Sequence, residues 1–542
     1  MHKRFETNNY HLLSNQMILR RFTSLNLHLN STIHNYLHRT KYSPSTTIKL
    51  DFQDTKRTYE SKSNFELWRS YLILKTCTYD VFVQNAEQMM RLSRRLLGHR
   101  IFTFFMKKSF YGQFAGGENM GELAPCVRHL AQHGVYSMLN YTVEADLEVA
   151  VDERNCQHNL EVLLDVLESS KRVCGDQQSF SSFKITGFTT PRLLFQLTDV
   201  ILGVRAVFMQ HSHVMSSESH VTSSNSTFSP QIRNNEIFLV NRVIPKDTFN
   251  SITNAPHIFD EADSDNLGYL DFYQFREALF GRPEVLNSIE GVGVTLTEDM
   301  IGGIERLRGR LTQLALRTKE LDTRIMIDAE QTYMQPAIDY FTVELMREHN
   351  TDTAYIFNTY QCYLKNTPNN VTLDAEDAAR RGYKLGVKLV RGAYMTEERA
   401  RAARLNYPSP VQDTKADTDS AYHAMVDVLL GLVSRDQCVM LAGSHNPDTA
   451  VYLMSEMRDR HIPLEKVYFG QLYGLCDPTS FLLSSNGYRV IKAIAWGPVQ
   501  EVLPFLARRA QENTGVLGTS TRELDLLKAE IRRRAFSRIH WH

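Results

Sequence analysis

Polar and charged side chains stand at one recurring position in this sequence, at or just after the end of a short apolar run. Lys184 stands in "FKITG", Asp328 ends "RIMID", and "GVKLVRGAY" contains Lys388 and Arg391. If these runs are parallel strands of one barrel, their carboxyl ends meet at a single mouth, where barrel enzymes place their active sites. The residues expected at this mouth are Lys184, Asp328, Gln361, Lys388, Arg391, Tyr394, His445 and Gln471.

Two adjacent arginines, Arg508 and Arg509, follow the last apolar run, in the helical segment "VQEVLPFLARRAQEN". With Lys184 they could hold a small carboxylate, because guanidinium groups bind carboxylates through bidentate, charge-assisted hydrogen bonds. Each residue alone also has a structural explanation, since strand-end aspartates often cap helices and arginines complement a helix C-terminus. Capping does not explain why polar groups end nearly every strand. We therefore interpret these residues as one site.

The motifs of several other catalytic classes are absent from the sequence. It contains no HExxH metal motif and no GxSxG nucleophile elbow. No pair of carboxylates shows a glycosidase-like arrangement, and no metal site is predicted. A carboxylate clamp without a nucleophile or a metal indicates that a bound cofactor performs the chemistry.

Eight apolar runs alternate with segments of helical periodicity from residue 130 onward, which predicts an α/β fold of the (β/α)8 barrel type. The runs are continuously apolar, as expected for strands buried on both faces. A doubly wound open sheet is the alternative, but no G-x-G-x-x-G motif follows the first run. The predicted strands are 135–141, 182–187, 324–328, 355–360, 386–390, 438–442, 467–471 and 489–494. The predicted helices include 336–349, 374–383, 419–433, 446–460 and 498–513.

Bulk composition excludes some partners and suggests a compartment. The 542 residues carry 61 basic and 61 acidic side chains, so no net field favours nucleic acid. Seven scattered cysteines without a CxxC pair favour a reducing compartment. The first 50 residues are basic and rich in Ser, Thr and Asn, with Glu6 as their one acid; this is typical of a mitochondrial transit peptide, and a disordered basic tail is the alternative. Residues 51–130 should form a helical N-terminal arm, and 131–542 the barrel.

An insertion over residues 205–300 separates the second and third predicted strands. Residues 211–230 are Ser-rich and predicted to be disordered. Residues 256–285 resemble an EF-hand helix-loop-helix, with Asp263, Asp265 and Asp271 at loop positions 1, 3 and 9. Leu267 and Gln274 stand at positions 5 and 12, where oxygen ligands are expected. The loop is therefore predicted to be degenerate and not to bind Ca²⁺ tightly.

Several motifs in a fixed order resemble those of the proline dehydrogenases. They are "IDAEQTY", "NTYQCYLK", "KLVRGAY", "SHN", "FGQLYGLCD" and "LARRAQEN", and "SFYGQFAGGE" in the arm resembles the eukaryotic branch of that family. The resemblance covers roughly residues 105–185 and 300–530. It implies a distorted (β/α)8 barrel that binds FAD and oxidises L-proline to Δ1-pyrroline-5-carboxylate. It also implies ubiquinone as electron acceptor and peripheral association with the matrix side of the inner mitochondrial membrane.

The resemblance assigns roles to individual residues. Asp328 would be an active-site carboxylate, and Lys388 a catalytic basic group near flavin N5, where many bacterial relatives have Arg. Glu118 would form a gate ion pair with Arg509. The residues that would contact substrate are Lys184, Tyr394, Ala493, Arg508 and Arg509. The residues that would contact FAD are Ala329, Gln361, Lys388, Arg391, Gly392, Ala393, Ser444 and His445.

Ala493, in "KAIAWG", leaves the choice of substrate open. Proline-specific members of the family carry tyrosine at the matching position, whereas hydroxyproline dehydrogenases carry a small residue. An alanine leaves room for a 4-hydroxyl group, unless Trp496 fills the space. The alternatives are therefore oxidation of L-proline or of trans-4-hydroxy-L-proline. Two other classes stay open: a different flavin barrel enzyme, such as a folate reductase, and a Ca²⁺-binding regulatory protein built on the EF-hand-like insert.

Overall fold

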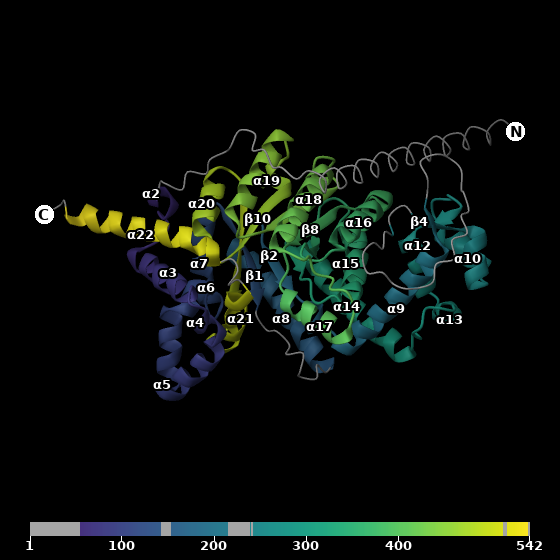
Figure 1. Ribbon diagram of the computed structural model, residues 1–542, viewed down its shortest axis with the longest axis horizontal. Helices are drawn as coiled ribbons and strands as arrows, with labels where there is room; N and C mark the ends of the chain where they lie inside the picture. The colour runs from purple at the N-terminus through teal and green to yellow at the C-terminus, as the bar shows by residue number, and fades with distance from the viewer. Residues whose placement is uncertain (1–54, 142–152, 215–238, 240–241, 513–516, 540–542) are drawn as a thin grey trace.

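A closed barrel of eight parallel strands forms the centre of the computed structural model, which describes residues 55–141, 153–214, 239, 242–512 and 517–539 (Figure 1). The strands follow the order β1-β11-β10-β9-β8-β7-β6-β2 around the barrel. This confirms the predicted barrel and excludes the open sheet. The strand bounds are β1 Val135–Tyr141, β2 Phe180–Phe183, β6 Arg324–Ile327, β7 Ile356–Gln361, β8 Leu385–Val390, β9 Cys438–Gly443, β10 Val467–Leu472 and β11 Arg489–Trp496.

The second strand lies earlier in the chain than predicted. β2 ends at Phe183, and Ile185–Gly187 form a 3₁₀ turn, η1, instead of continuing the strand. The strand pairs in register with β6, from Phe180 opposite Arg324 to Phe183 opposite Ile327. Its serines are buried in the barrel wall, and their polarity hid this strand from a search for apolar runs.

Side chains of alternate strand residues point to opposite faces of the barrel wall. The inward-facing residues form one buried cluster: Met138, Phe180, Met326, Phe357, Val439, Leu441, Tyr468 and Ile491. The outward-facing residues pack against helices in a second, larger core. The helices of this outer layer are α8 Glu153–Cys174, α9 Pro191–His211, α14 Glu298–Glu320, α15 Gln335–His349, α16 Thr367–Arg381, α17 Met395–Leu405, α18 Lys415–Val433, α19 Pro447–Asp459 and α20 Asp477–Ser485.

One helix of the described chain, α9, is long and apolar enough to cross a membrane by length and composition. Half of its apolar window is buried inside the protein, and Leu194, Leu197 and Ile201 belong to the outer core. The apolar composition of α9 is therefore explained by its packing in the protein core.

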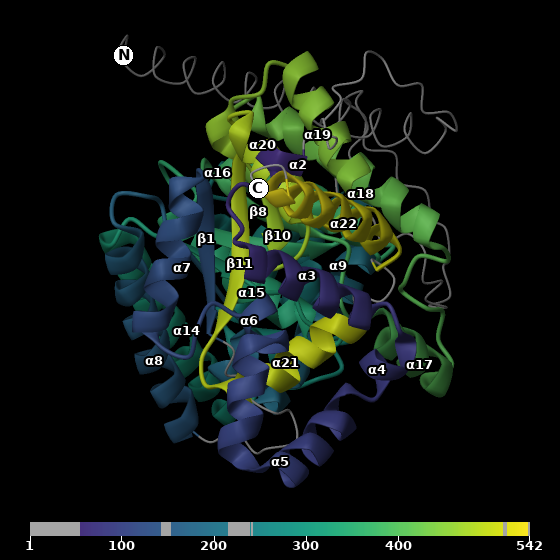
Figure 2. The same ribbon diagram turned by 90° about the vertical axis from the view of Figure 1, so that its left-hand side faces the viewer.

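The helix after the eighth strand, α21 Val499–Glu512, packs against the N-terminal arm. Its apolar stripe, Val499, Val502, Leu503 and Leu506, is buried against Phe102, Tyr111 and Ala115 of the arm. Figure 2 shows α21 beside α5 and α6, beyond the end of β11. The arm consists of α2 Thr55–Thr58, α3 Asn64–Cys77, α4 Asp80–Gln84, α5 Ala86–Lys108, α6 Phe110–Phe114 and α7 Met120–Gln132, and the last helix of the chain, α22 Leu517–Ile539, packs on α3.

A buried charge network ties the arm to the barrel. Lys492 of β11 is fully buried, and its ammonium group lies 2.9 Å from Asp477 at the start of α20. Lys62, which precedes α3, lies 2.8 Å from the same carboxylate. Burial favours the neutral form of Asp477, but the two lysines outweigh it and hold its pKa well below the usual range. The network therefore fixes the position of the arm relative to the barrel.

The insertion folds against the barrel at the end of the molecule opposite the arm (Figure 1). It contains a small antiparallel sheet of β3 His213–Val214, β4 Arg242–Pro245 and β5 Tyr269–Leu270. Its helices are α10 Lys246–Thr253, α11 Pro256–Ala262, α12 Phe272–Phe280 and α13 Pro283–Ser288. Disorder was predicted over 211–230, which is wrong for His211 and β3; residues 215–230 lie outside the described residues, as does the segment 1–50.

Candidate active site

An ion pair between neighbouring strands stands at the mouth of the barrel. Lys388 of β8 and Asp328, the residue after β6, approach to 2.6 Å between Nζ and Oδ1. Their side chains keep 14% and 26% of their surface exposed, so both can reach a ligand. Among the described residues, Asp328 is the one hydrogen-bond partner of the Lys388 ammonium group, which has three N–H donors. The pair therefore keeps unused donors at the mouth.

A second acid, Glu330, lies beside Lys184 at the next edge of the mouth. Lys184 connects β2 to η1 and is half-buried. The carboxylate of Glu330 accepts hydrogen bonds from the amide and the hydroxyl of Thr186, at 3.3 and 3.0 Å. Burial raises the pKa of Glu330 to about 7, although the charge of Lys184 acts in the opposite direction. Lys184 thus lies near one acid, Glu330, whose pKa is raised toward neutral pH.

The guanidinium of Arg391 is held by three other elements of the barrel. It donates to Asp419 at 2.6 Å, to Ser444 Oγ at 2.8 Å and to Thr449 Oγ1 at 3.0 Å. The guanidinium carbon Cζ of Arg391 also lies 4.6 Å from the centre of the Tyr422 ring, within the range of a cation–π contact. A planar cation with this many contacts is held in one orientation. The hydrogen bond to Ser444 also shows that the structure brings together two of the residues predicted to contact FAD.

His445 is held neutral beside Arg391. Its Nε2 accepts a hydrogen bond from the Leu472 amide at 3.0 Å, so the neutral ring carries its proton on Nδ1. Burial, with the charges of Lys492 and Arg391, lowers the pKa of His445 to about 3. Gln361, the last residue of β7, is buried and donates to the Glu330 carbonyl at 2.9 Å. Both side chains offer fixed, uncharged hydrogen-bonding groups.

Small residues line the mouth next to these groups. Gly392 has φ +129°, and a Cβ added there would lie 1.5 Å from a carbon of the Tyr363 ring, so only glycine fits. Gly392 is exposed, and Ala393 and Tyr394 after it are half-buried. Ala329 is 9% exposed. Gly392, Ala393 and Ala329 contribute little side-chain bulk, which suits the approach of a flat ligand.

Ala493 faces the barrel interior, and Trp496 does not. Ala493 packs on the inner cluster and pairs with Met138 of β1 and Leu472 of β10. Trp496 is an odd number of residues away and belongs to the outer core, on the other face of the strand. The idea that Trp496 fills the space beside Ala493 is therefore wrong. Ala493 remains half-exposed at the inner face.

The two arginines of the predicted clamp lie in α21, but their side chains are outside the described part of the chain. The gate partner Glu118 is described. Its carboxylate pairs with Lys107 of α5, and its Oε1 accepts from the backbone amide of Val499, at the start of α21, at 3.1 Å. Glu118 thus fixes the start of the helix that carries Arg508 and Arg509, and its pairing with Arg509 stays a prediction.

The donor set at the mouth fits a large anionic cofactor with a flat ring. Lys388, Arg391 and Ser444 present cationic and hydroxyl groups, and Gly392 and Ala393 follow Arg391 with little side-chain bulk. Within the described residues, no group of three or more His, Cys, Asp or Glu side chains could hold a metal ion. The mouth is therefore suited to an organic cofactor.

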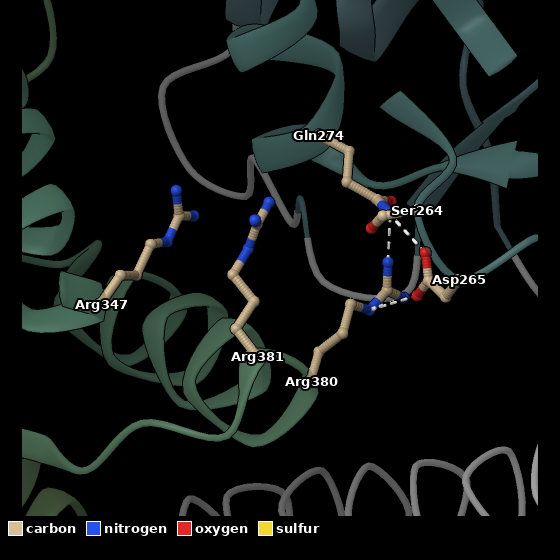
Figure 3. Close-up of a pocket in the computed structure, with 6 residues that line it drawn as sticks. All are labelled: Ser264, Asp265, Gln274, Arg347, Arg380 and Arg381. Carbon is tan, nitrogen blue, oxygen red and sulfur yellow. Dashed lines mark hydrogen bonds and ion pairs between the residues drawn. The ribbon is translucent and has the colours of Figure 1, made fainter. Parts of the chain in front are cut away.

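The EF-hand-like loop uses its carboxylates within the protein. Asp263 accepts from the amides of Leu267 and Gly268, both at 2.8 Å. Arg380 of barrel helix α16 lies 2.8 Å from Asp271. It also lies 3.8 Å from Asp265 and donates to Gln274 Oε1 at 2.9 Å (Figure 3). The guanidinium thus supplies positive charge to the loop. A cavity of ≈ 380 Å³ beside it is lined by Ser264, Asp265, Gln274, Arg347, Arg380 and Arg381.

Sequence reasoning missed the residues that support the site. Glu330 stands directly after Ala329 in the motif "IDAEQTY". Lys492 is a charged residue in the middle of an apolar strand, and such a residue signals a buried ion pair. Asp419, which holds Arg391, carries no comparable signal, because it lies on a helix among other polar residues.

Comparison with solved structures agrees with the fold. The chain is similar to the crystal structure of proline utilization A (PutA) from Bdellovibrio bacteriovorus inactivated by N-propargylglycine, with a TM-score of 0.51 and 16% sequence identity. The match covers 91% of this chain and 41% of that chain, so this chain spans less than half of that protein. At this identity the likeness concerns the barrel fold alone.

Sequence relatives define the family. The family model described as "Proline dehydrogenase" matches residues 124–522. "Proline dehydrogenase 1, mitochondrial" of Homo sapiens is 33% identical over 544 residues, and 90% of each chain is covered. "Hydroxyproline dehydrogenase" of Xenopus laevis is 31% identical over 505 residues, which cover 92% of this chain and 93% of that relative. The chain belongs to the proline dehydrogenase family.

Proposed function

We propose that the protein is an FAD-dependent dehydrogenase that oxidises L-proline to Δ1-pyrroline-5-carboxylate. The observation that carries this proposal is the set of polar and cationic groups at one barrel mouth, with the Lys388–Asp328 pair at 2.6 Å and the small residues Gly392 and Ala393. Membership in the proline dehydrogenase family supports the same substrate and cofactor. The competing classes, a folate reductase and a Ca²⁺-regulated binding protein, have no comparable support.

The side chains of the mouth divide the work of binding and orientation. When bound, FAD supplies the hydride acceptor of the reaction. Arg391, Ser444, His445, Gln361, Gly392, Ala393 and Ala329 would hold it. Lys184, Arg508 and Arg509 would hold the substrate carboxylate, because fixed cations orient a small anion at little cost in entropy. Asp328 orients Lys388. The remaining N–H donors of Lys388 would place a positive charge near the flavin and the substrate.

The electrons would pass to a quinone at the matrix side of the inner mitochondrial membrane. Three observations support this: the basic, acid-poor composition of residues 1–50, the mitochondrial relative from Homo sapiens, and the packing of the arm on α21 after the last barrel strand. Peripheral attachment would allow a membrane-soluble acceptor to reach the site without a spanning helix.

The position of Ala493 favours a second candidate substrate, trans-4-hydroxy-L-proline. The small side chain faces the barrel interior and is half-exposed, so it leaves space there for a hydroxyl group. An alanine gives that hydroxyl no hydrogen-bond partner, which costs about 1–3 kcal/mol unless an ordered water supplies the bond. We therefore place L-proline first and 4-hydroxyproline second.

Steady-state kinetics test the proposal. Purified protein is assayed with L-proline, trans-4-hydroxy-L-proline and a reduced folate, with a short-chain quinone or a redox dye as acceptor. We expect saturable oxidation of L-proline and formation of a cyclic imine. Turnover of the folate with no response to either amino acid would contradict the proposal.

A further inference from the structure

The arm carries an unusual concentration of exposed apolar side chains. Thirteen of the twenty-one large apolar residues that are exposed in the described chain lie in or between α3 and α5. Monomeric proteins rarely expose so much apolar surface in one region unless it contacts something. We call these residues the arm surface: Phe65, Trp68, Leu72, Tyr79, Val81, Phe82, Met89, Leu92, Leu96, Leu97, Ile101, Phe104 and Phe105.

The first half of α5 is amphipathic as well as exposed. At 100° per residue, Met89, Leu92 and Leu96 fall on one side of the helix, and Arg91, Arg94 and Arg95 fall on the other. Nearly every side chain described from residue 88 to 100 is exposed, so this apolar stripe has no partner within the described chain. Gly98, with φ 74° and ψ 163°, then turns the helix, and its second half packs on α21 through Phe102 and Met106.

The charges around the arm surface identify the kind of partner. The sequence of α5 contains six arginine and lysine residues and one acid, Glu87. Arg91, Arg94, Arg95 and Arg100 are exposed and form no ion pair with any described residue. A second copy of the chain would bring these cations face to face and repel. An anionic bilayer can instead bury the leucines below its headgroups and bind the arginines through the charge of those headgroups.

The geometry points to a docking site: we propose that the arm surface binds the protein to an anionic lipid bilayer. This deepens the proposed function and rests on it for the quinone acceptor, but the binding itself is independent of catalysis. α3 presents Phe65, Trp68 and Leu72 at i, i+3 and i+7, on the side opposite to the buried Leu67 and Leu74. In Figures 1 and 2 the helices α4 and α5 project from the body of the protein, where a flat surface can reach them.

Docking at this surface would bring lipid close to the barrel mouth. The second half of α5 carries Ile101, Phe104 and Phe105 of the arm surface and packs on α21 through Phe102 and Met106. The Tyr111 hydroxyl of α6 also donates to the Gly497 carbonyl at 2.8 Å, just before α21. The helix that carries Arg508 and Arg509 therefore packs directly on a helix of the proposed lipid contact. A quinone dissolved in the bilayer would then have a short path to the mouth.

Vesicle co-sedimentation of the full-length protein tests the proposal. Vesicles of phosphatidylcholine with phosphatidylglycerol are compared with vesicles of phosphatidylcholine alone, at low and high salt. We expect binding to the anionic vesicles that weakens with salt and falls about tenfold or more in the double variant L92E/L96E. Leu316→Glu, at an exposed leucine of α14, is the matched control and should bind as the wild type does.

Activity with a soluble dye separates this proposal from the proposed function. L92E/L96E should oxidise L-proline with the dye at the wild-type rate, which also shows that it folds. If the wild type binds no anionic vesicles, or if L92E/L96E binds them as well as the wild type does, the proposal is wrong. A wild-type dimer that L92E/L96E converts to monomer, without vesicle binding, would also overturn it and assign the surface to self-association. A loss of proline oxidation in every form would instead count against the proposed function.

Discussion

Two regions of this molecule gather the same kinds of side chain and use them differently. At the mouth, Lys388 lies 2.6 Å from Asp328 and has no other described partner. At the insert loop, Arg380 lies 2.8 Å from Asp271 and also bonds Gln274, while Gln274 in turn bonds Asp265 at 2.7 Å. The exposed fractions of the two pairs are similar, so burial does not distinguish them. The two regions differ in the number of hydrogen-bond donors left unused, and the unused donors of Lys388 are what the proposed binding site requires.

The largest difference should appear when the cation of each region is removed. Lys388→Met should lower kcat/KM for L-proline by about 100-fold or more, because a fixed charge that acts in the transition state is lost. Arg380→Met should leave kcat/KM unchanged, because its charge serves the insert loop. Steady-state kinetics of both variants provide the comparison. Equal losses in the two variants would show that the mouth is not the catalytic region.

The helix after the last barrel strand, α21, should contribute to substrate binding through its two arginines. We expect Arg508→Met or Arg509→Met to lower kcat/KM by about 30-fold or more, mostly through KM, because losing one partner of a desolvated charge pair costs about 2–5 kcal/mol. The variants should remain folded and yellow. Arg532→Met, at an exposed arginine of α22, is the control. Wild-type KM values in both α21 variants would refute the carboxylate clamp.

The insert loop should respond in stability and not in activity. Arg380→Met leaves Asp271 without its cation and should lower the free energy of unfolding by about 1–3 kcal/mol. Urea unfolding measures this change, with Arg404→Met, an exposed residue of α17, as the control. Micromolar Ca²⁺ should change neither stability nor activity in the wild type. Sub-micromolar Ca²⁺ binding by calorimetry would contradict this account of the loop.

The smallest effect concerns specificity within the mouth. Ala493→Tyr should shift the ratio of kcat/KM for L-proline over trans-4-hydroxy-L-proline in favour of proline by about tenfold or more, because pocket changes of this size shift specificity by about 10–200-fold. Ala403→Tyr, on the exposed side of α17, should leave the ratio alone. An unchanged ratio in Ala493→Tyr would show that this position does not contact the substrate.

The sequence predicted the barrel because seven of its strands are continuous apolar runs, and continuity is the signal of a strand buried on both faces. The predicted second strand, 182–187, begins two residues later than β2, because the buried serines of β2 interrupt its apolar run. Sequence reasoning also missed β3, β4 and β5, because strands of two to four residues are too short to show a period. Period-2 alternation along β11 already places Ala493 and Trp496 on opposite faces, so the position of Trp496 could have been predicted.

The site could be predicted in part. The mouth residues follow from strand ends, and the structure brings Lys388 to Asp328 and Arg391 to Ser444. The partners that hold them, such as Asp419 and Thr449, come from elements distant in sequence, and no local pattern marks such contacts. The pairing of Arg380 with the insert loop is equally non-local. A degenerate EF-hand pattern shows which ligands are missing, but not which side chain supplies the charge.

The most direct test of the central claim, that the barrel mouth is the site of proline oxidation, is an anaerobic titration of the purified protein with L-proline. The visible absorption spectrum is followed in the wild type and in Lys388→Met. We predict a flavin spectrum in both proteins, rapid bleaching by L-proline in the wild type, and slow or no bleaching in the variant. A wild-type protein without flavin absorption, or a flavin that L-proline does not bleach, would contradict the account.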